Sequence, residues 1–183
     1  QAILKYIGEY ALVSYTIISY VNTIVVMSMA GIAQGTQPLI SYYYGKNESE
    51  KYKKLLKYGM VAAAAGSVVA VLICYVGAES IVGLFLKESE ASLSIYSVRV
   101  LRIFILSFLL AGLNVVLGGY FTSVEKAGFA TMISLTRSLI ALVISLVFLT
   151  AVFGGEAIWW APLIAESCCL VLSAGLYQWY RKK

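Results

Sequence analysis

Two ionisable side chains lie deep inside apolar stretches of this 183-residue sequence. Arg137 is about ten residues inside the apolar run 127–153, and Glu166 is about ten residues inside the run 157–180. A charged side chain in the middle of a bilayer costs about 3 kcal/mol on insertion scales, unless it faces a cavity, finds a partner or, for Glu, takes up a proton. Glu166 is therefore either a protonation or cation-binding site, or a structural partner for Arg137 or for hydroxyl groups on a neighbouring helix.

Polar and small side chains also form a stripe along the first apolar run. At 100° per residue its members fall within about 60° of arc. They are Thr16, Ser19, Thr23, Ala30, Gln34, Gln37 and Ser41. Two glutamines on one face exceed what close packing requires, so Thr23, Gln34 and Gln37 are candidates for lining a water-accessible cavity. Packing against other helices, with small polar groups at the contact, is the alternative interpretation.

The other runs carry comparable stripes. The second places Gly59, Ala63, Gly66, Ala70, Cys74 and Gly77 along one line, a small-xxx-small pattern that predicts close helix packing. The third carries Ser107, Ala111, Asn114 and Gly118, and the fourth carries Thr131, Ser134, Ser138, Ala141 and Ser145. Packing is slightly favoured over a cavity wall for these two stripes. Asn114 is nevertheless a candidate for a cavity or coupling residue.

Five apolar runs must position these side chains, and each is long enough for a spanning helix. They are residues 10–44, 55–77, 93–122, 127–153 and 157–180. With 61% hydrophobic and only 13% charged residues, the chain has too little charge to solvate a water-exposed surface. The predicted fold class is all-α, an integral membrane bundle of five complete spanning helices in a lipid bilayer.

Three local features qualify this outline. Pro38 removes one backbone donor from the first helix and predicts a kink there. Residues 1–8 are expected to be the end of an earlier helix and a turn. Residues 80–86 are too few to span and are expected to lie at the membrane interface.

The composition argues against several kinds of chemistry. The chain has no His and no Asp, and its three cysteines lie in apolar runs without a CxxC spacing. We therefore expect no metal site, no catalytic residue and no cofactor. No phosphate-binding glycine loop and no nucleophile–base pair occur in the sequence, which argues against an ATP-driven pump and an enzyme. Membrane topology explains the net charge of +5 better than nucleic-acid binding does.

Basic residues gather on alternate connections between the runs. Nine lie on one side: Lys46, Lys51, Lys53, Lys54, Lys57, Lys126, Arg181, Lys182 and Lys183. The other side has Lys5 and Lys87, with Arg99 and Arg102 interpreted as interfacial. The positive-inside rule then places the C-terminus in the cytoplasm. Five spans place Gln1 outside, and no signal peptide precedes it, so we expect a further span upstream in a longer chain.

Four segments, in order, resemble the multidrug and toxic compound extrusion (MATE) family. Residues 31–47 read GIAQGTQPLISYYYGKN, similar to a G-x-x-Q-x-x-Q-P-L-I-x-x-x-x-G segment that the family repeats in each lobe. A basic loop ending in Lys53 and Lys54 follows. SLTR at residues 134–137 is similar to the family's S-L-x-R, and GEAIWWAP at residues 155–162 is similar to its G-x-x-I-W-x-A. The resemblance covers nearly the whole chain.

The resemblance implies that residues 1–183 form the C-terminal lobe of a twelve-helix transporter. Family members are secondary antiporters that export organic cations or amphipathic drugs in exchange for Na⁺ or H⁺, by alternating access of two six-helix lobes. The implied partners are the missing N-terminal lobe of the same chain, a small-molecule substrate and the lipid bilayer. The expected location is a cell membrane, in particular a bacterial plasma membrane.

The resemblance also indicates a departure and leaves two alternatives. Many members carry cation-binding acids on the seventh and tenth helices, whereas here the seventh is almost entirely absent and the tenth offers Asn114 and no acid. Coupling would then use Glu166 or an acid in the missing half. A lipid-linked oligosaccharide flippase of the same superfamily is one alternative, although Arg137 alone is a poor match for a pyrophosphate-binding cavity. A non-transporting remnant or packing module of a membrane protein is the other.

Overall fold

The computed structural model describes residues 8–87 and 90–182, and within these residues it is helical without strands. The main helices are α2 (Glu9–Gly45), α3 (Ser49–Val76), α4 (Ala78–Gly83), α5 (Ala91–Phe104), α6 (Phe108–Ser123), α7 (Ala127–Leu135), α8 (Ala141–Phe153) and α9 (Ala161–Lys182). Between them lie the 3₁₀ turns η2 (Ile105–Ser107) and η4 (Gly155–Trp160) and the π-helical turn η3 (Thr136–Ile140). The earlier helix end expected at residues 1–8 lies outside the described residues, apart from Gly8.

The helices join into five rods that are long and apolar enough to cross a membrane. α2 and α3 are two of them; the others are Ala91–Ser123, Ala127–Phe153 and Gly155–Lys182, each of which includes one irregular turn. This confirms the predicted all-α bundle. α2 continues through Pro38 as a single helix, so the proline does not end it. α4 has six residues and is too short to cross, as expected for this segment.

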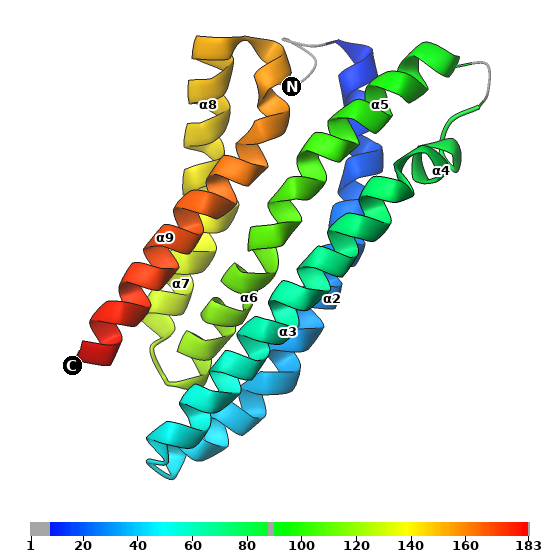
Figure 1. Ribbon diagram of the computed structural model, residues 1–183. Helices are drawn as coiled ribbons and strands as arrows, with labels where there is room; N and C mark the ends of the chain where they lie inside the picture. Colours follow the sequence, from blue (N-terminus) through cyan, green and yellow to red (C-terminus); the bar gives the residue numbers. More distant parts are fainter. Residues whose placement is uncertain (1–7, 88–89, 183) are drawn as a thin grey trace.

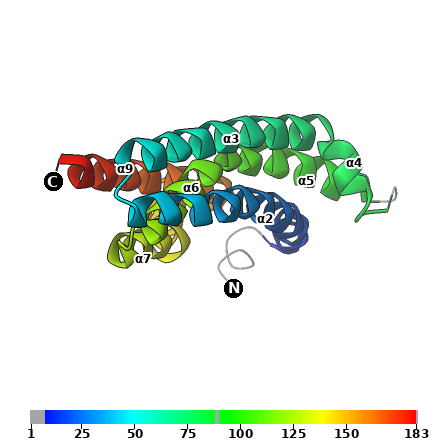
Figure 2. The ribbon, with the colours of Figure 1, turned by 90° about the horizontal axis from the view of Figure 1, so that it is seen from below.

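The rod that contains α6 lies at the centre of the bundle. In this rod, 56% of the most apolar window is buried, compared with 22% to 33% in the other four. α6 contacts α2, α3, α7 and α9, and the two views of the ribbon show it surrounded by them (Figures 1 and 2). Large side chains exposed on the outer helices are themselves apolar, such as Val76 and Val171, which are 80% and 75% exposed. An apolar exterior of this kind suits contact with lipid.

Small residues let α2, α3 and α6 approach one another closely. A methyl group added at Gly112 of α6 would lie 2.5 Å from Ser67 Oγ and 3.0 Å from Met29 Sδ. A methyl group at Gly59 of α3 would lie 3.3 Å from both Thr36 and Val116 side-chain carbons. The predicted small-residue line of the second run therefore does lie at a helix contact, as the spacing indicated.

The charged connections separate to the two ends of the bundle. The α2–α3 hairpin, the α6–α7 connection and the end of α9 lie together at one end (Figure 1). They carry eight of the nine basic residues predicted for one side, Lys183 lying outside the described residues. The opposite end carries α4 and the start of α5. Glu79 of α4 pairs at 3.1 Å with Arg102, which lies in the last turn of α5. The bundle thus has one basic end, as the alternation along the sequence indicated.

Candidate functional site

A partly open cavity of about 540 Å³ lies between the N-terminal half of α2 and the last third of the chain. α2 contributes Tyr15, Ser19 and Asn22, which are spaced i, i+4 and i+7 and so share one helix face. Phe104 and Ser107 contribute the wall formed by the middle rod. The volume falls within the range of about 300–1,000 Å³ that is usual for small-molecule sites.

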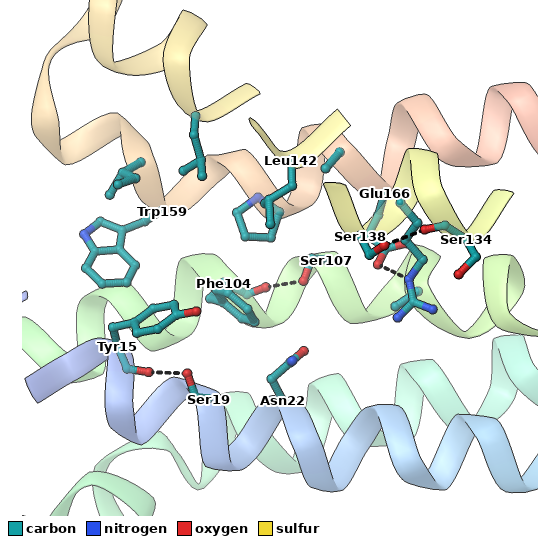
Figure 3. A pocket seen from close by; sticks show the side chains of 16 residues that line it. Tyr15, Ser19, Asn22, Phe104, Ser107, Ser134, Ser138, Leu142, Trp159 and Glu166 are labelled. Atoms are coloured by element: carbon teal, nitrogen blue, oxygen red, sulfur yellow. Dashed lines mark hydrogen bonds and ion pairs between the residues drawn. The ribbon is translucent and has the colours of Figure 1, made fainter. Parts of the chain in front are cut away.

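The two ends of the cavity differ in chemistry. Figure 3 shows Tyr15 and Trp159 at one end and Glu166, Ser134 and Ser138 at the other. The indole Nε1 of Trp159 donates to Tyr96 Oη at 3.1 Å, which fixes the orientation of the ring. The cavity is therefore aromatic at one end and charged at the other.

The charged end is an ion pair between neighbouring rods. Arg137 Nε donates to Glu166 Oε1 at 2.8 Å, and both residues line the cavity. The side chains are 25% and 12% exposed, respectively. Each charge supplies the counter-charge that the other needs in an apolar environment. The structure thus brings together the two intramembrane charges that the sequence singled out.

Asn114 of α6 completes this network from the centre of the bundle. Its Nδ2 donates to Glu166 Oε2 at 2.7 Å and to the Glu166 backbone carbonyl at 2.9 Å. The hydroxyl of Ser173, two turns beyond Glu166 on α9, donates to the Cys169 carbonyl and lies 3.5 Å from Asn114 Oδ1. Asn114 is buried behind the carboxylate and is absent from the cavity lining. Both oxygens of Glu166 therefore accept a hydrogen bond from protein.

Two irregular backbone turns contribute to the lining of this cavity. Arg137 and Ser138 lie in the π-helical turn η3, and Ser107 lies in the 3₁₀ turn η2. Such turns disturb the regular ladder of helix hydrogen bonds, and π-turns in particular are frequent at functional sites. Non-helical backbone at membrane depth is tolerated where it lines a cavity or is buried in protein.

The remaining candidates from the sequence lie elsewhere. Thr23 and Gln34 are exposed on α2, outside the cavity lining, and the Thr23 hydroxyl donates to the Ser19 carbonyl of its own helix at 2.8 Å. Gln37 is half-buried against α6, with its Nε2 at 2.7 Å from where a Gly119 methyl group would be. The predicted stripe thus divides into a part that faces outward, a part that packs against α6, and Ser19, which lines the cavity.

The structure also adds residues to the site. Ser107, Ala111, Ser134 and Ser138 line the cavity, although packing was slightly favoured for their stripes. Tyr15, Asn22 and Phe104 had not been identified as candidates. Of the three α2 residues in the cavity, Ser19 belongs to the predicted stripe of polar and small residues. Tyr15 and Asn22 share its face by their i, i+4, i+7 spacing, which was a signal for this face.

Comparison with known proteins identifies the family. The family model described as MatE matches residues 1–147, which is most of the chain. The chain belongs to the MatE family. Members of this family are transporters rather than enzymes, and the apolar rods make this chain a multi-pass membrane protein.

Related sequences cover the same part of the family. The chain is 26% identical over 166 residues to the multidrug export protein MepA of Staphylococcus haemolyticus (strain JCSC1435), and 24% identical to MepA of Staphylococcus aureus (strain MRSA252). Each comparison covers 91% of this chain but only 36% of the relative. The chain thus spans little more than a third of the length of these MatE relatives.

Solved structures support the same fold. The chain matches a MATE protein in complex with MaL6 with a TM-score of 0.87 and 17% identity, covering 99% of this chain and 40% of that one. It matches the outward-facing and inward-facing conformations of a multidrug resistance MATE family transporter with TM-scores of 0.87 and 0.86, at 16% and 17% identity. These matches cover 99% of this chain and 40% and 41% of those chains.

Proposed function

We propose that this chain is the C-terminal lobe of a secondary antiporter that exports organic cations or amphipathic drugs in exchange for Na⁺ or H⁺. The observation that carries the proposal is the cavity of about 540 Å³ bounded by the Arg137–Glu166 pair, inside a lobe with the MatE fold. Intramembrane charges that face a cavity are typical of substrate and ion pathways. The multidrug export described for the MepA relatives agrees with this proposal.

Alternating access by rigid lobes is the proposed mechanism. The similarity of this lobe to an outward-facing and to an inward-facing transporter is nearly equal, with TM-scores of 0.87 and 0.86. This favours a motion in which the lobe keeps its internal packing while its orientation changes. The exposed residues Thr16, Thr23 and Gln34 of α2 would then face the other lobe across the central cavity.

The orientation follows from the charges. Lys46, Lys51, Lys53, Lys54 and Lys57 lie at the basic end of the bundle. We propose that this end and the C-terminus lie in the cytoplasm of a bacterial cell, according to the positive-inside rule. Labelling a cysteine placed in the α2–α3 hairpin with an impermeant reagent checks this, because labelling from outside intact cells would contradict the orientation.

The role of Glu166 in coupling is tested by Glu166→Gln in the full-length transporter. The contacts of its carboxylate favour a structural role, since Arg137 and Asn114 each occupy one oxygen. We therefore expect dye export to keep its dependence on Na⁺ and on pH when the two are varied separately. Glu79→Gln is the matched control at an exposed acid. Loss of either dependence in Glu166→Gln alone would instead make Glu166 a coupling residue.

Transport itself requires the other lobe. We propose that cells carrying residues 1–183 alone export no drug, because the central cavity lies between two lobes; efflux from such cells would contradict this. An upstream reading frame with six or seven further spans would support the exporter, whereas a stop codon would support a remnant. The flippase alternative is disfavoured, because a pyrophosphate requires a strongly basic cavity, and Arg137 is the one cation among the lining residues in the described part of the chain.

A further inference from the structure

The Arg137–Glu166 pair presents its two partners to the cavity unequally. Arg137 is the more exposed of the two, 25% against 12% for Glu166. Its bond to the carboxylate uses Nε, and in the described part of the chain no acceptor hydrogen-bonds its two terminal nitrogens. The carboxylate, in contrast, already accepts from Arg137 and from Asn114. The pair can therefore still offer a ligand hydrogen-bond donors, the terminal nitrogens of Arg137.

Three of the four serines that line the cavity offer a ligand hydrogen-bond acceptors. Ser19 donates to the Tyr15 carbonyl at 2.8 Å, Ser107 to the Phe104 carbonyl at 2.8 Å, and Ser138 to the Ser134 carbonyl at 2.7 Å. Because each hydroxyl hydrogen is bonded within its own helix, its oxygen has lone pairs available to a ligand. Tyr15, Phe104 and Trp159 add aromatic rings, which attract cations and flat apolar groups.

These observations define a ligand of mixed charge. We infer that this cavity binds amphipathic aromatic molecules that carry a carboxylate, with the acid on the terminal nitrogens of Arg137 and the aromatic, amino-bearing body toward Tyr15 and Trp159. A guanidinium fork matches the two oxygens of a carboxylate. The inference rests on the proposed function in that it names a substrate class for the same cavity, and it assigns recognition of the acid to Arg137.

Two related dyes can show whether the cavity recognises a carboxylate or only a cation. The probes are an aminoxanthene dye with a free carboxylate and its methyl ester, which share one aromatic body and differ in the acid. Binding of each to the purified full-length protein is measured by fluorescence polarisation, and export of each is measured in cells. Arg137→Gln combined with Glu166→Gln removes both charges together, so that no unpaired charge is left in the membrane.

We expect this double variant to bind the acid dye about tenfold more weakly, the effect of losing a charge-assisted hydrogen bond, and to bind the ester as before. Unchanged ester binding also shows that the variant is folded. Glu166→Gln alone should bind the acid dye at least as tightly as the wild type, because Arg137 is kept. Arg137→Lys, which keeps the charge but loses the planar fork, should fall between.

The outcomes separate the inference from the function on which it rests. Equal losses for acid and ester, no loss for either, or no binding of the acid dye by the wild type would overturn the assignment of the acid to Arg137. A loss of ester binding in Glu166→Gln alone would also overturn it, because the cavity would then recognise cations through the carboxylate. Selective binding of the acid dye without export would leave the inference standing and count against the exporter.

Discussion

The two sides of α6 contact their neighbouring helices through different kinds of interaction. Toward α2 and α3 it presents Gly112 and Gly119, where an added methyl group would lie within 2.5 Å and 2.7 Å of neighbouring side-chain atoms. Toward α9 it presents Asn114, which bonds the Glu166 carboxylate and backbone. We call α2, α3 and α6 the packed unit, and the network of Asn114, Arg137 and Glu166 the polar unit.

The difference indicates which contacts hold the lobe rigid and which serve the cavity. Within lipid there is no hydrophobic drive between helices, so close packing through small residues is a main source of association in the packed unit. The polar unit instead buries charge beside a cavity and includes a π-helical turn, an arrangement that packing alone does not require. We therefore expect substitutions in the packed unit to alter stability, and those in the polar unit to alter both stability and ligand binding.

The largest expected effect on stability comes from removing one member of the polar unit. Arg137→Gln leaves the Glu166 carboxylate, only 12% exposed, without a counter-charge. Breaking a buried pair from one side costs about 3–5 kcal/mol, so we expect the free energy of unfolding of the full-length protein to fall by about 3 kcal/mol. The measurement is chemical denaturation in detergent. The Arg137→Gln, Glu166→Gln double variant should recover most of the loss; equal losses in both would show that the pair is not the cause.

Two leucines compare a filled core position on α6 with the cavity wall. Leu117 of α6 is 5% exposed within the packed core, whereas Leu142 of α8 lines the cavity. Leu117→Ala should cost about 3 kcal/mol because it creates a new void. Leu142→Ala should cost about 1 kcal/mol because part of the side chain already faces open space. Thermal denaturation of the two variants checks the difference, and a larger loss for Leu142→Ala would contradict the distinction between a filled core and an open cavity wall.

Two glycines on α6 test how close the packing is. Gly112→Ala places a methyl group 2.5 Å from Ser67 Oγ, so the helices must separate or Ser67 must rotate. We expect a loss of about 2 kcal/mol, within the usual range for overpacking. Gly118→Ala is the matched control, because the nearest atom lies at 3.9 Å and alanine favours a helix over glycine. Equal melting temperatures for the two variants would show that the Gly112 contact can relax freely.

Much of the fold could be predicted from the sequence because a membrane-spanning helix is recognisable from its own apolar residues, without knowledge of its contacts. The apolar runs gave five rods, and the alternation of lysine-rich connections indicated one basic end. Spacing also predicted the close contact at Gly59, because residues four apart share a helix face. The irregular turns η2 and η3 carry no comparable local signal, since both lie within apolar sequence that is compatible with a regular α-helix.

The candidate site could be predicted only in part. Arg137 and Glu166 stood out because charge is expensive in an apolar run, and a contact between them was one of the expected interpretations. Thr23 and Gln34 were selected for polarity alone, yet polarity does not tell which polar face turns toward α8 and α9 and which turns outward. That choice depends on the rotation of α2 about its axis, which is set by packing at residues far along the chain, such as Gly112 against Met29.

The smallest expected effect concerns an ion pair between α4 and α5, Arg102 with Glu79. Its 3.1 Å bond is similar in length to that of the polar unit, but Glu79 is 76% exposed and Arg102 is 36% exposed. Water and salt screen such a pair, and the Arg102 guanidinium also lies 5.2 Å from the Tyr75 ring centroid, so it keeps a favourable contact without Glu79. Glu79→Gln should therefore lower the free energy of unfolding by less than about 0.5 kcal/mol. A loss as large as that expected for Arg137→Gln would show that burial does not determine how much each ion pair contributes to stability.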